Sequence, residues 1–291
     1  MNHLDLVKLT ALMEIASGRP EIVIGLIDGP VAINHPDLAG AHIREIPARL
    51  ESMCAQAGST ACTHGTFVAG ILCAKRDSPA PAICPDCTLL VRPIFADTTP
   101  ETARMPSATP EELATAIIDC IEAKVHVINL SASLDRLSTN SQRELEEALD
   151  YATRRGVLVV AAAGNQGMLG SSAITRHPWV IPVMACDLQG RPMGQSNLGI
   201  SIGRRGLGAP GDHITSLGAG GKPLTLGGTS AAAPFVTGAV ALLWSAFPGA
   251  AVAEIKMAVT QTYARRRATV VPPVLDGWSA YQIMARRSSR R

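Results

Sequence analysis

The sequence has few aromatic residues and almost no excess charge. Only 3% of its 291 residues are aromatic, so a buried core has to be built mainly from alanine, valine, isoleucine and leucine. With 47% hydrophobic residues, that core can be large. A net charge of +2 lacks the strong basic excess of many nucleic-acid-binding proteins, so we expect no nucleic-acid partner. The short basic segment 285–291 is predicted to be a flexible, solvated tail.

Long apolar runs and targeting signals are also missing. No stretch approaches the roughly 18 consecutive apolar residues of a membrane span, so we expect no membrane partner. Residues 1–20 have neither the basic start nor the continuous apolar stretch of a secretory signal. We therefore expect a cytoplasmic protein. The sequence leaves open whether this N-terminal extension is an ordered lid or a loose end.

The cysteines do not form a metal-binding pattern. An odd number of cysteines in a cytoplasmic chain favours free thiols, although a disulfide between Cys54 and Cys62, or between Cys84 and Cys87, stays open. Cys84 and Cys87 form a single CxxC pair that nothing nearby completes as a zinc site. We therefore predict no metal and no cofactor. The seven cysteines are Cys54, Cys62, Cys73, Cys84, Cys87, Cys120 and Cys186.

Four continuous apolar runs predict strands that are buried on both faces. Residues 109–123 begin with a capping box formed by Thr109 and Glu112, and residues 141–156 have acids early, arginines late and a terminal glycine, so both are predicted helices. This alternation predicts an α/β fold, a mainly parallel β-sheet sandwiched by helices. No linker divides the chain, so residues 1–291 are expected to form one domain. The apolar runs are 21–28, 88–95, 125–131 and 157–164.

Candidate functional residues gather at the expected carboxyl ends of strands and at helix starts. Chemistry in parallel sheets is found at the carboxyl ends of the strands, so these side chains are expected to converge. The candidates are Asp28, Asn129, Ser131 and Asn165 at strand ends, and His64 and Ser230 at helix starts.

Asp28, His64 and Ser230 together supply the three groups of a serine hydrolase. A serine hydroxyl needs an imidazole to take its proton, and the imidazole needs a carboxylate on its other nitrogen. The order Asp-His-Ser along the chain is one in which such triads occur. Taken singly, each residue also has an ordinary structural role, as a turn-capping aspartate, a histidine at a helix start or an N-cap serine.

Four segments in order resemble the signature blocks of the subtilisin-like serine proteases, or subtilases. The resemblance implies that Asp28 orients His64, which acts as general base and acid for the nucleophile Ser230. It also implies that the side chain of Asn165 and the N–H of Ser230 donate to the oxyanion. The segments are IGLIDGPVAINHPDL (24–38), THGTFVAGI (63–71), VVAAAGNQG (159–167) and GGTSAAAPFVTGAVALL (227–243).

The sequence also predicts structural roles for Gly65, next to His64, and for Pro234, which follows Ser230. Gly65 is expected to leave room beside the imidazole of His64. Pro234 is expected in the first turn of its helix, where its missing N–H would have no helical partner.

The resemblance also implies a substrate-binding strand and a pocket for the residue before the scissile bond. The strand reads Ser131-Ala132-Ser133 where relatives usually have Ser-x-Gly, so Ser133 is expected to narrow the pocket or to bring a hydroxyl to it. Gly164 is assigned to this pocket. Arg176 is expected near its base, where it would favour an acidic or strongly polar side chain, unless it is a surface arginine that points away.

Many subtilases bind calcium, and Asp37 matches an acid of that kind of site. The following loop, 74–87, is basic and rich in proline, with few of the oxygen ligands that calcium requires. We therefore expect no calcium there.

Two segments are similar to the proteases that mature ribosomally made peptides, of the cyanobactin type. They are HGTFVAG (64–70) and VRPIFAD (91–97). This similarity predicts an endopeptidase that removes a leader from a precursor peptide in the cytoplasm. A catalytically inactive subtilase that binds peptides and a macrocyclising transpeptidase stay open as alternatives. No long insertion near His64 is present to shield an acyl-enzyme from water, which counts against cyclisation.

Overall fold

Parallel strands form the central sheet of this computed structural model, which describes residues 2–46, 54, 58–95, 108–131, 139–260 and 269–289. Within these residues the sheet has seven strands in the order β2-β3-β1-β4-β5-β6-β7, all parallel, and β8 and β9 form a separate antiparallel pair. The strands are β1 (Val23–Asp28), β2 (His42–Glu45), β3 (Thr88–Pro93), β4 (Val127–Leu130), β5 (Leu158–Ala162), β6 (Val180–Cys186), β7 (Leu207–Pro210), β8 (Ile214–Leu217) and β9 (Pro223–Leu226).

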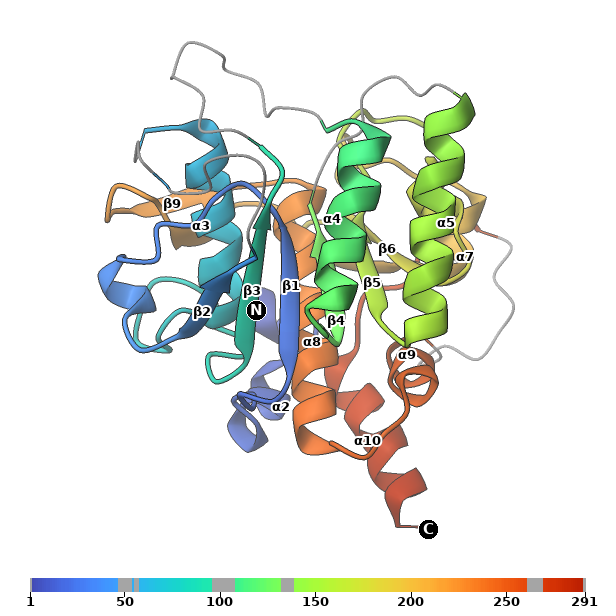
Figure 1. The fold of residues 1–291 in the computed structure, drawn as a ribbon. Coiled ribbons are helices and arrows are strands. Elements are labelled where there is room, and N and C mark those ends of the chain that lie inside the picture. Colours follow the sequence, from blue (N-terminus) through green and yellow to red (C-terminus); the bar gives the residue numbers. More distant parts are fainter. Residues whose placement is uncertain are drawn as a thin grey trace.

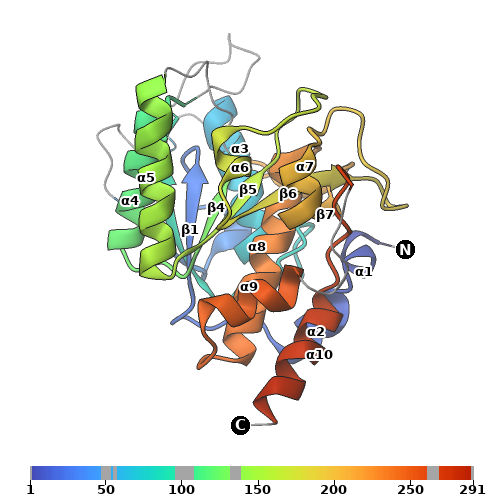
Figure 2. The same cartoon turned by 90° about the vertical axis from the view of Figure 1, so that its right-hand side faces the viewer.

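Helices cover both faces of this sheet (Figure 1). Figure 2 shows α4 and α5 on one side of the sheet and α8 and α9 on the other. The predicted α/β fold with a parallel sheet between helices is confirmed. The helices are α1 (His3–Leu6), α2 (Thr10–Ile15), the 3-10 helix η1 (Pro36–Leu38), α3 (Thr60–Cys73), α4 (Pro110–Glu122), α5 (Thr139–Arg155), α6 (Ala173–Arg176), α7 (Ile200–Arg205), α8 (Thr229–Ala246), α9 (Val252–Thr260) and α10 (Gly277–Ser288).

Local signals in the sequence explain several of these boundaries. The capping box of Thr109 and Glu112 is present at the start of α4, with both hydrogen bonds formed. Gly156 follows the end of α5 in a left-handed conformation, with φ of 71°. The strand β6 is fully buried in the interior of the sheet and is not predicted from the sequence, since Pro182 inside it is unusual for such a strand.

The helix α8 forms the centre of the core. It packs against β4, β5, β6 and β7. Of the helices in the described part of the chain, it is the one that is long and apolar enough to cross a membrane, so the prediction that no such segment exists is wrong by length and composition. Since 89% of it is buried inside the protein, its apolar character is explained by the core.

The N-terminal segment from residue 2 packs against the start of α10. Val7 and Leu9 are fully buried beside the start of α10, where the carbonyl of Val7 accepts a 2.9 Å hydrogen bond from the N–H of Gly277. The described part of the N-terminal extension is therefore ordered, and it lies against the N-terminal end of α10. Residues 285–288 form the last turn of α10, so the flexible tail predicted from residue 285 is wrong for these four residues.

Candidate active site

Asp28 is the last residue of β1 and is fully buried. Its Oδ1 atom accepts a 2.6 Å hydrogen bond from the N–H of Gly29 and lies 2.7 Å from Nδ1 of His64. Its Oδ2 atom has no hydrogen-bond partner among the described residues. One carboxylate oxygen therefore holds both the turn that follows β1 and the imidazole.

Two glycines let α3 approach the end of β1 closely. A Cβ atom at Gly29 would overlap the carbonyl oxygen of Ala61, and one at Gly65 would overlap the carbonyl oxygen of Gly29. Only glycine fits either position, and the close approach places His64 against Asp28. Gly65 therefore makes room for the backbone of the neighbouring turn, and the expectation that it also leaves room beside the imidazole of His64 stays a prediction.

His64 joins Asp28 to Ser230. Its Nε2 atom lies 2.9 Å from Oγ of Ser230, while its Nδ1 atom faces Asp28. When the imidazole is neutral, Nδ1–H donates to the carboxylate and Nε2 accepts from the hydroxyl of Ser230. The hydroxyl proton then faces the nitrogen that can take it. The structure thus brings together the three residues that the sequence grouped.

Burial and the Asp28 carboxylate act in opposite directions on the pKa of His64. Burial lowers that pKa because it disfavours the charged imidazolium, and the side chain is only 7% exposed. The negative charge of Asp28 and its hydrogen bond both favour the imidazolium. These two effects prevail, so the pKa of His64 is raised above its ordinary value of 6.5.

Ser230 lies in the first turn of α8, directly after a glycine turn. The N-cap residue Gly228 has a φ of 113°, in the region that favours glycine, and a Cβ atom there would crowd the side-chain amide of Asn165. The N–H of Ser230 has no acceptor among the described residues. It is one of the N–H groups at the positive end of α8 that no helical carbonyl can reach.

Pro234 removes the usual helical partner of the Ser230 carbonyl. In an α-helix that carbonyl accepts from the N–H four residues later, and Pro234 has none. The hydroxyl of Ser131 donates to the carbonyl instead, at 3.4 Å. Since α8 begins at Thr229, Pro234 lies beyond the first turn, and the prediction that its missing N–H has no helical counterpart is wrong. Ser131, at the end of β4, compensates for it.

A buried polar network holds Ser131 in this position. Nδ2 of Asn129 donates to the hydroxyl of Ser131 at 2.9 Å, and the hydroxyl of Thr237 donates to Oδ1 of Asn129 at 2.8 Å. The network links β4 to α8. The predicted substrate-binding residues Ala132 and Ser133 lie outside the described residues, and a substrate contact of Ser131 stays a prediction.

Asn165 is held by Thr229, a residue that the sequence analysis did not single out. Oδ1 of Asn165 accepts hydrogen bonds from the N–H of Thr229 at 2.9 Å and from its hydroxyl at 3.1 Å. The same hydroxyl accepts from the N–H of Gly164 at 3.1 Å. Because Oδ1 is occupied, Nδ2 of Asn165 is left over as a donor, without an acceptor among the described residues. A threonine beside a helix start resembles an ordinary cap, so its sequence signal is weak.

A cavity of about 330 Å³ opens beside Asn165. Gly164 is among the residues that line this cavity, and Arg176 is not. Arg176 is the exposed last residue of α6, and its carbonyl accepts from Nη2 of Arg205 at 2.8 Å. The exposure of Arg176 agrees with the alternative that it is a surface arginine, and its place at the base of a substrate pocket stays a prediction. The lining includes Gly164, Gln166, Ser171, Ser172, Ile174 and Asn197.

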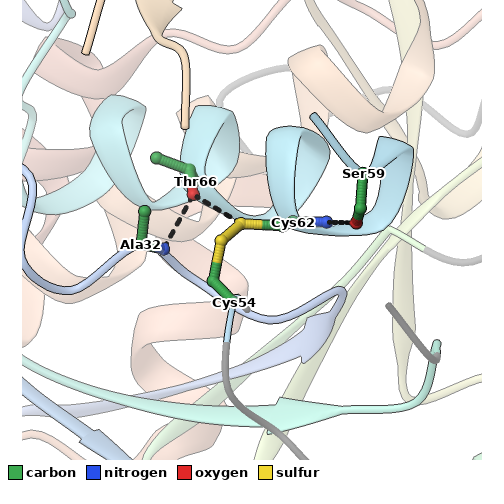
Figure 3. Close-up of a disulfide and its surroundings, with 5 residues drawn as sticks. All are labelled: Ala32, Cys54, Ser59, Cys62 and Thr66. Atoms are coloured by element: carbon green, nitrogen blue, oxygen red, sulfur yellow. Dashed lines mark hydrogen bonds between the residues drawn. A yellow bond between two sulfur atoms is a disulfide. The ribbon is translucent and has the colours of Figure 1, made fainter. Parts of the chain in front are cut away.

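A disulfide joins Cys54 to Cys62 in the first turn of α3 (Figure 3). The two Cα atoms are 5.5 Å apart, within the usual range for such a bond. The hydroxyl of Ser59 caps the same turn by accepting from the N–H of Cys62 at 3.1 Å. The expectation of free thiols is therefore wrong for Cys54 and Cys62. Their disulfide fixes the first turn of α3, two residues before His64. The cytoplasmic location stays a prediction.

The remaining cysteines are buried free thiols, and the open alternative of a disulfide between Cys84 and Cys87 is not realised. Hydrogen bonds with the thiols of Cys73 and Cys87, together with burial, raise the pKa of Cys84 well above its ordinary value. Among the described residues no group of three or more His, Cys, Asp or Glu side chains is placed to hold a metal ion.

Comparison with known proteins assigns the family. The model of the Subtilase family matches residues 19–278. The chain is 33% identical over 260 residues to a thermophilic serine proteinase of Bacillus sp. (strain AK1), covering 86% of this chain and 58% of that relative, so it spans little more than half of the relative's length.

Two solved structures resemble the whole fold. A mutant of the protease domain of PatA is 30% identical, with a TM-score of 0.81, over 93% of this chain and 98% of that one. The prenylagaramide maturation protease PagA is also 30% identical, with a TM-score of 0.79, over 94% of this chain and 98% of that one. With the matched family model and the geometry around Ser230, they lead to one conclusion: this chain belongs to the subtilase family.

Proposed function

We propose that this protein is a serine endopeptidase in which Ser230 is the nucleophile. The observation that carries the proposal is the unbroken series of contacts from Asp28 through His64 to Ser230, at 2.7 Å and 2.9 Å. Nε2 of His64 takes the hydroxyl proton as Oγ attacks the scissile carbonyl carbon, and then gives it to the leaving amine. The acyl-enzyme is hydrolysed by the same steps in reverse, with water in place of the amine.

Two donors beside Ser230 are suited to the negative charge that develops on the substrate oxygen. They are the N–H of Ser230 and Nδ2 of Asn165, neither of which has an acceptor among the described residues. Donors that are already fixed in place stabilise the tetrahedral intermediate without reorganisation. Thr229 fixes Asn165 by occupying its Oδ1 atom.

We also propose that the substrate is a precursor peptide from which a leader is removed. The support is the likeness over almost the whole chain to PatA and PagA, which are named as maturation proteases. Mass spectrometry of the products tests this, because hydrolysis adds the mass of one water to the fragments and ring closure does not. A product without that added mass would favour the transpeptidase alternative.

The test of the nucleophile is labelling with a fluorophosphonate probe. We expect the wild-type protein to be labelled and Ser230→Ala to stay unlabelled, because the probe reacts with an activated serine. A Ser245→Ala variant, which changes another serine of α8, is a control and should be labelled like the wild type. A folded wild-type protein that resists the probe would favour an inactive, peptide-binding subtilase.

The raised pKa of His64 sets the pH dependence. We expect kcat/KM to rise with pH along an acid limb whose midpoint lies above 6.5, the ordinary value for histidine. Below that midpoint His64 is protonated and cannot take the proton of Ser230, and kcat/KM reports the pKa of the free enzyme. Peptide cleavage rates across the pH range measure the midpoint. A midpoint below 6.5 would mean that burial outweighs the charge of Asp28.

A further inference from the structure

The cavity beside Asn165 is placed to receive the side chain of the residue that contributes the scissile carbonyl. This step rests on the proposed function. The scissile carbonyl has to lie between Oγ of Ser230 and Nδ2 of Asn165, and the side chain of the same residue branches from the Cα atom that is bonded to the carbonyl carbon. Both neighbours of Asn165, Gly164 and Gln166, line the cavity. The chemistry of that lining therefore selects the residue before the cut.

Asn197 fixes the orientation of one wall of this cavity. Its Oδ1 atom accepts from the N–H of Gln166 at 3.1 Å and from the N–H of Met168 at 2.9 Å. Its Nδ2 atom must then be the donor, and it donates to the carbonyl of Ala163 at 3.1 Å and to Oε1 of Gln166 at 2.6 Å. All four of these contacts agree on one orientation of the Asn197 amide.

The orientation of Asn197 decides which end of Gln166 is free. Because Oε1 of Gln166 accepts from Asn197, its Nε2 atom carries the two N–H groups that make no hydrogen bond to a described residue. The two amides lie across Gly164, where a Cβ atom would overlap both of them. Gly164 has a φ of 102°, which glycine adopts readily. Because Gly164 has no side chain, the amides of Asn197 and Gln166 can occupy this space, and the N–H groups on Nε2 of Gln166 make no hydrogen bond to a described residue.

The other described residues of the lining are neutral. Met168 and Ile174 provide apolar surface for methylene groups, and Ser171 and Ser172 provide further polar atoms. No charged side chain among the described residues lines the cavity. A carboxylate would lose hydration there without gaining a cation, and an ammonium group would face the N–H groups of Gln166.

We propose that Gln166, held by Asn197, selects substrates with a neutral carboxamide side chain, glutamine or asparagine, before the scissile bond. The oxygen of that side chain accepts from Nε2 of Gln166, and its methylene groups pack on the apolar part of the lining. An isosteric apolar residue leaves the donors of Gln166 without an acceptor.

Cleavage of a proteome-derived peptide library, with the residue before each cut read by mass spectrometry, tests this selection. We expect glutamine and asparagine to be enriched at that position. For a synthetic pair that differs only there, we expect glutamine to exceed methionine by about tenfold in kcat/KM. Equal cleavage of the two peptides by untreated enzyme, from a preparation of which a separate sample reacts with the fluorophosphonate probe, would overturn the selection and leave the proposed protease function intact. Failure of both labelling and cleavage would overturn the two together.

Two variants of Gln166 distinguish the effect of its N–H donors from the effect of its side-chain size. Gln166→Met keeps the length but removes the amide, so it is expected to lose the preference for glutamine while still cleaving the methionine peptide. Gln166→Glu replaces the donors by a carboxylate and is expected to shift the preference towards lysine. Gln195→Met, which makes the same change outside the cavity lining, is the control and should keep the wild-type preference. Retention of the glutamine preference by Gln166→Met would overturn the assignment.

Discussion

Replacing Asp28 by alanine is expected to lower kcat by about 10⁴-fold, with a much smaller effect on KM. The carboxylate holds Nδ1–H of His64 at 2.7 Å and so presents Nε2 to Ser230 as an acceptor. It also stabilises the imidazolium that forms when Nε2 takes the proton. Alanine removes both effects at a fully buried position. Steady-state cleavage of one peptide by the wild type and the variant measures the loss.

Asp28→Asn separates the orientation of His64 from the charge. The N–H of Gly29 donates to the same Oδ1 atom that faces His64, so it favours the asparagine oxygen at that position. The oxygen can then keep His64 in the useful tautomer, and the loss in kcat should be smaller than in Asp28→Ala. A loss as large as that of alanine would show that the Gly29 N–H does not fix the amide.

The pH profile of Asp28→Asn provides a second readout. Without the negative charge, burial remains as the main influence on the pKa of His64, and burial lowers it. The acid limb of kcat/KM is therefore expected to move to lower pH than in the wild type, even though the maximal rate falls. An unchanged midpoint would mean that Asp28 does not set the pKa of His64.

The groups that react could be predicted from the sequence, because each carries a distinctive residue type at a strand or helix end. Asp28 ends a continuous apolar run, and Ser230 follows a glycine turn, so their places at the edge of the sheet follow from the fold class. The parallel order of the strands then brings the ends of β1, β4 and β5 side by side.

The residues that position these groups could not be predicted in the same way. Thr229 donates to Asn165 at 3.1 Å, and Ser131, a candidate residue for another reason, donates to the Ser230 carbonyl at 3.4 Å; both contacts depend on the exact tertiary packing. The resemblance to the subtilases places Arg176 near the pocket, but the short helix α6 buries Ile174 and leaves Arg176 exposed. Which face a short helix buries depends on its packing, and four residues are too few to show it in a hydrophobic pattern.

Replacing Asn165 by leucine is expected to lower kcat by about 10²–10³-fold and to leave KM nearly unchanged. Nδ2 of Asn165 is proposed to donate to the substrate oxygen only once that oxygen carries negative charge, so its loss weakens the transition state more than the bound substrate. Leucine has a similar size and no donor. Single-turnover and steady-state rates together show whether the acylation step carries the loss.

Thr229→Val completes the experiment, because it removes the hydroxyl that holds Asn165 while keeping the N–H that also does so. We expect a loss of roughly tenfold, since one of the two hydrogen bonds that orient Asn165 is kept. In the Asn165→Leu background the same change should have little effect, because the side chain that Thr229 orients is already gone. The difference between the two backgrounds measures the coupling of the pair. Equal losses in both would mean that Thr229 acts on the reaction independently of Asn165.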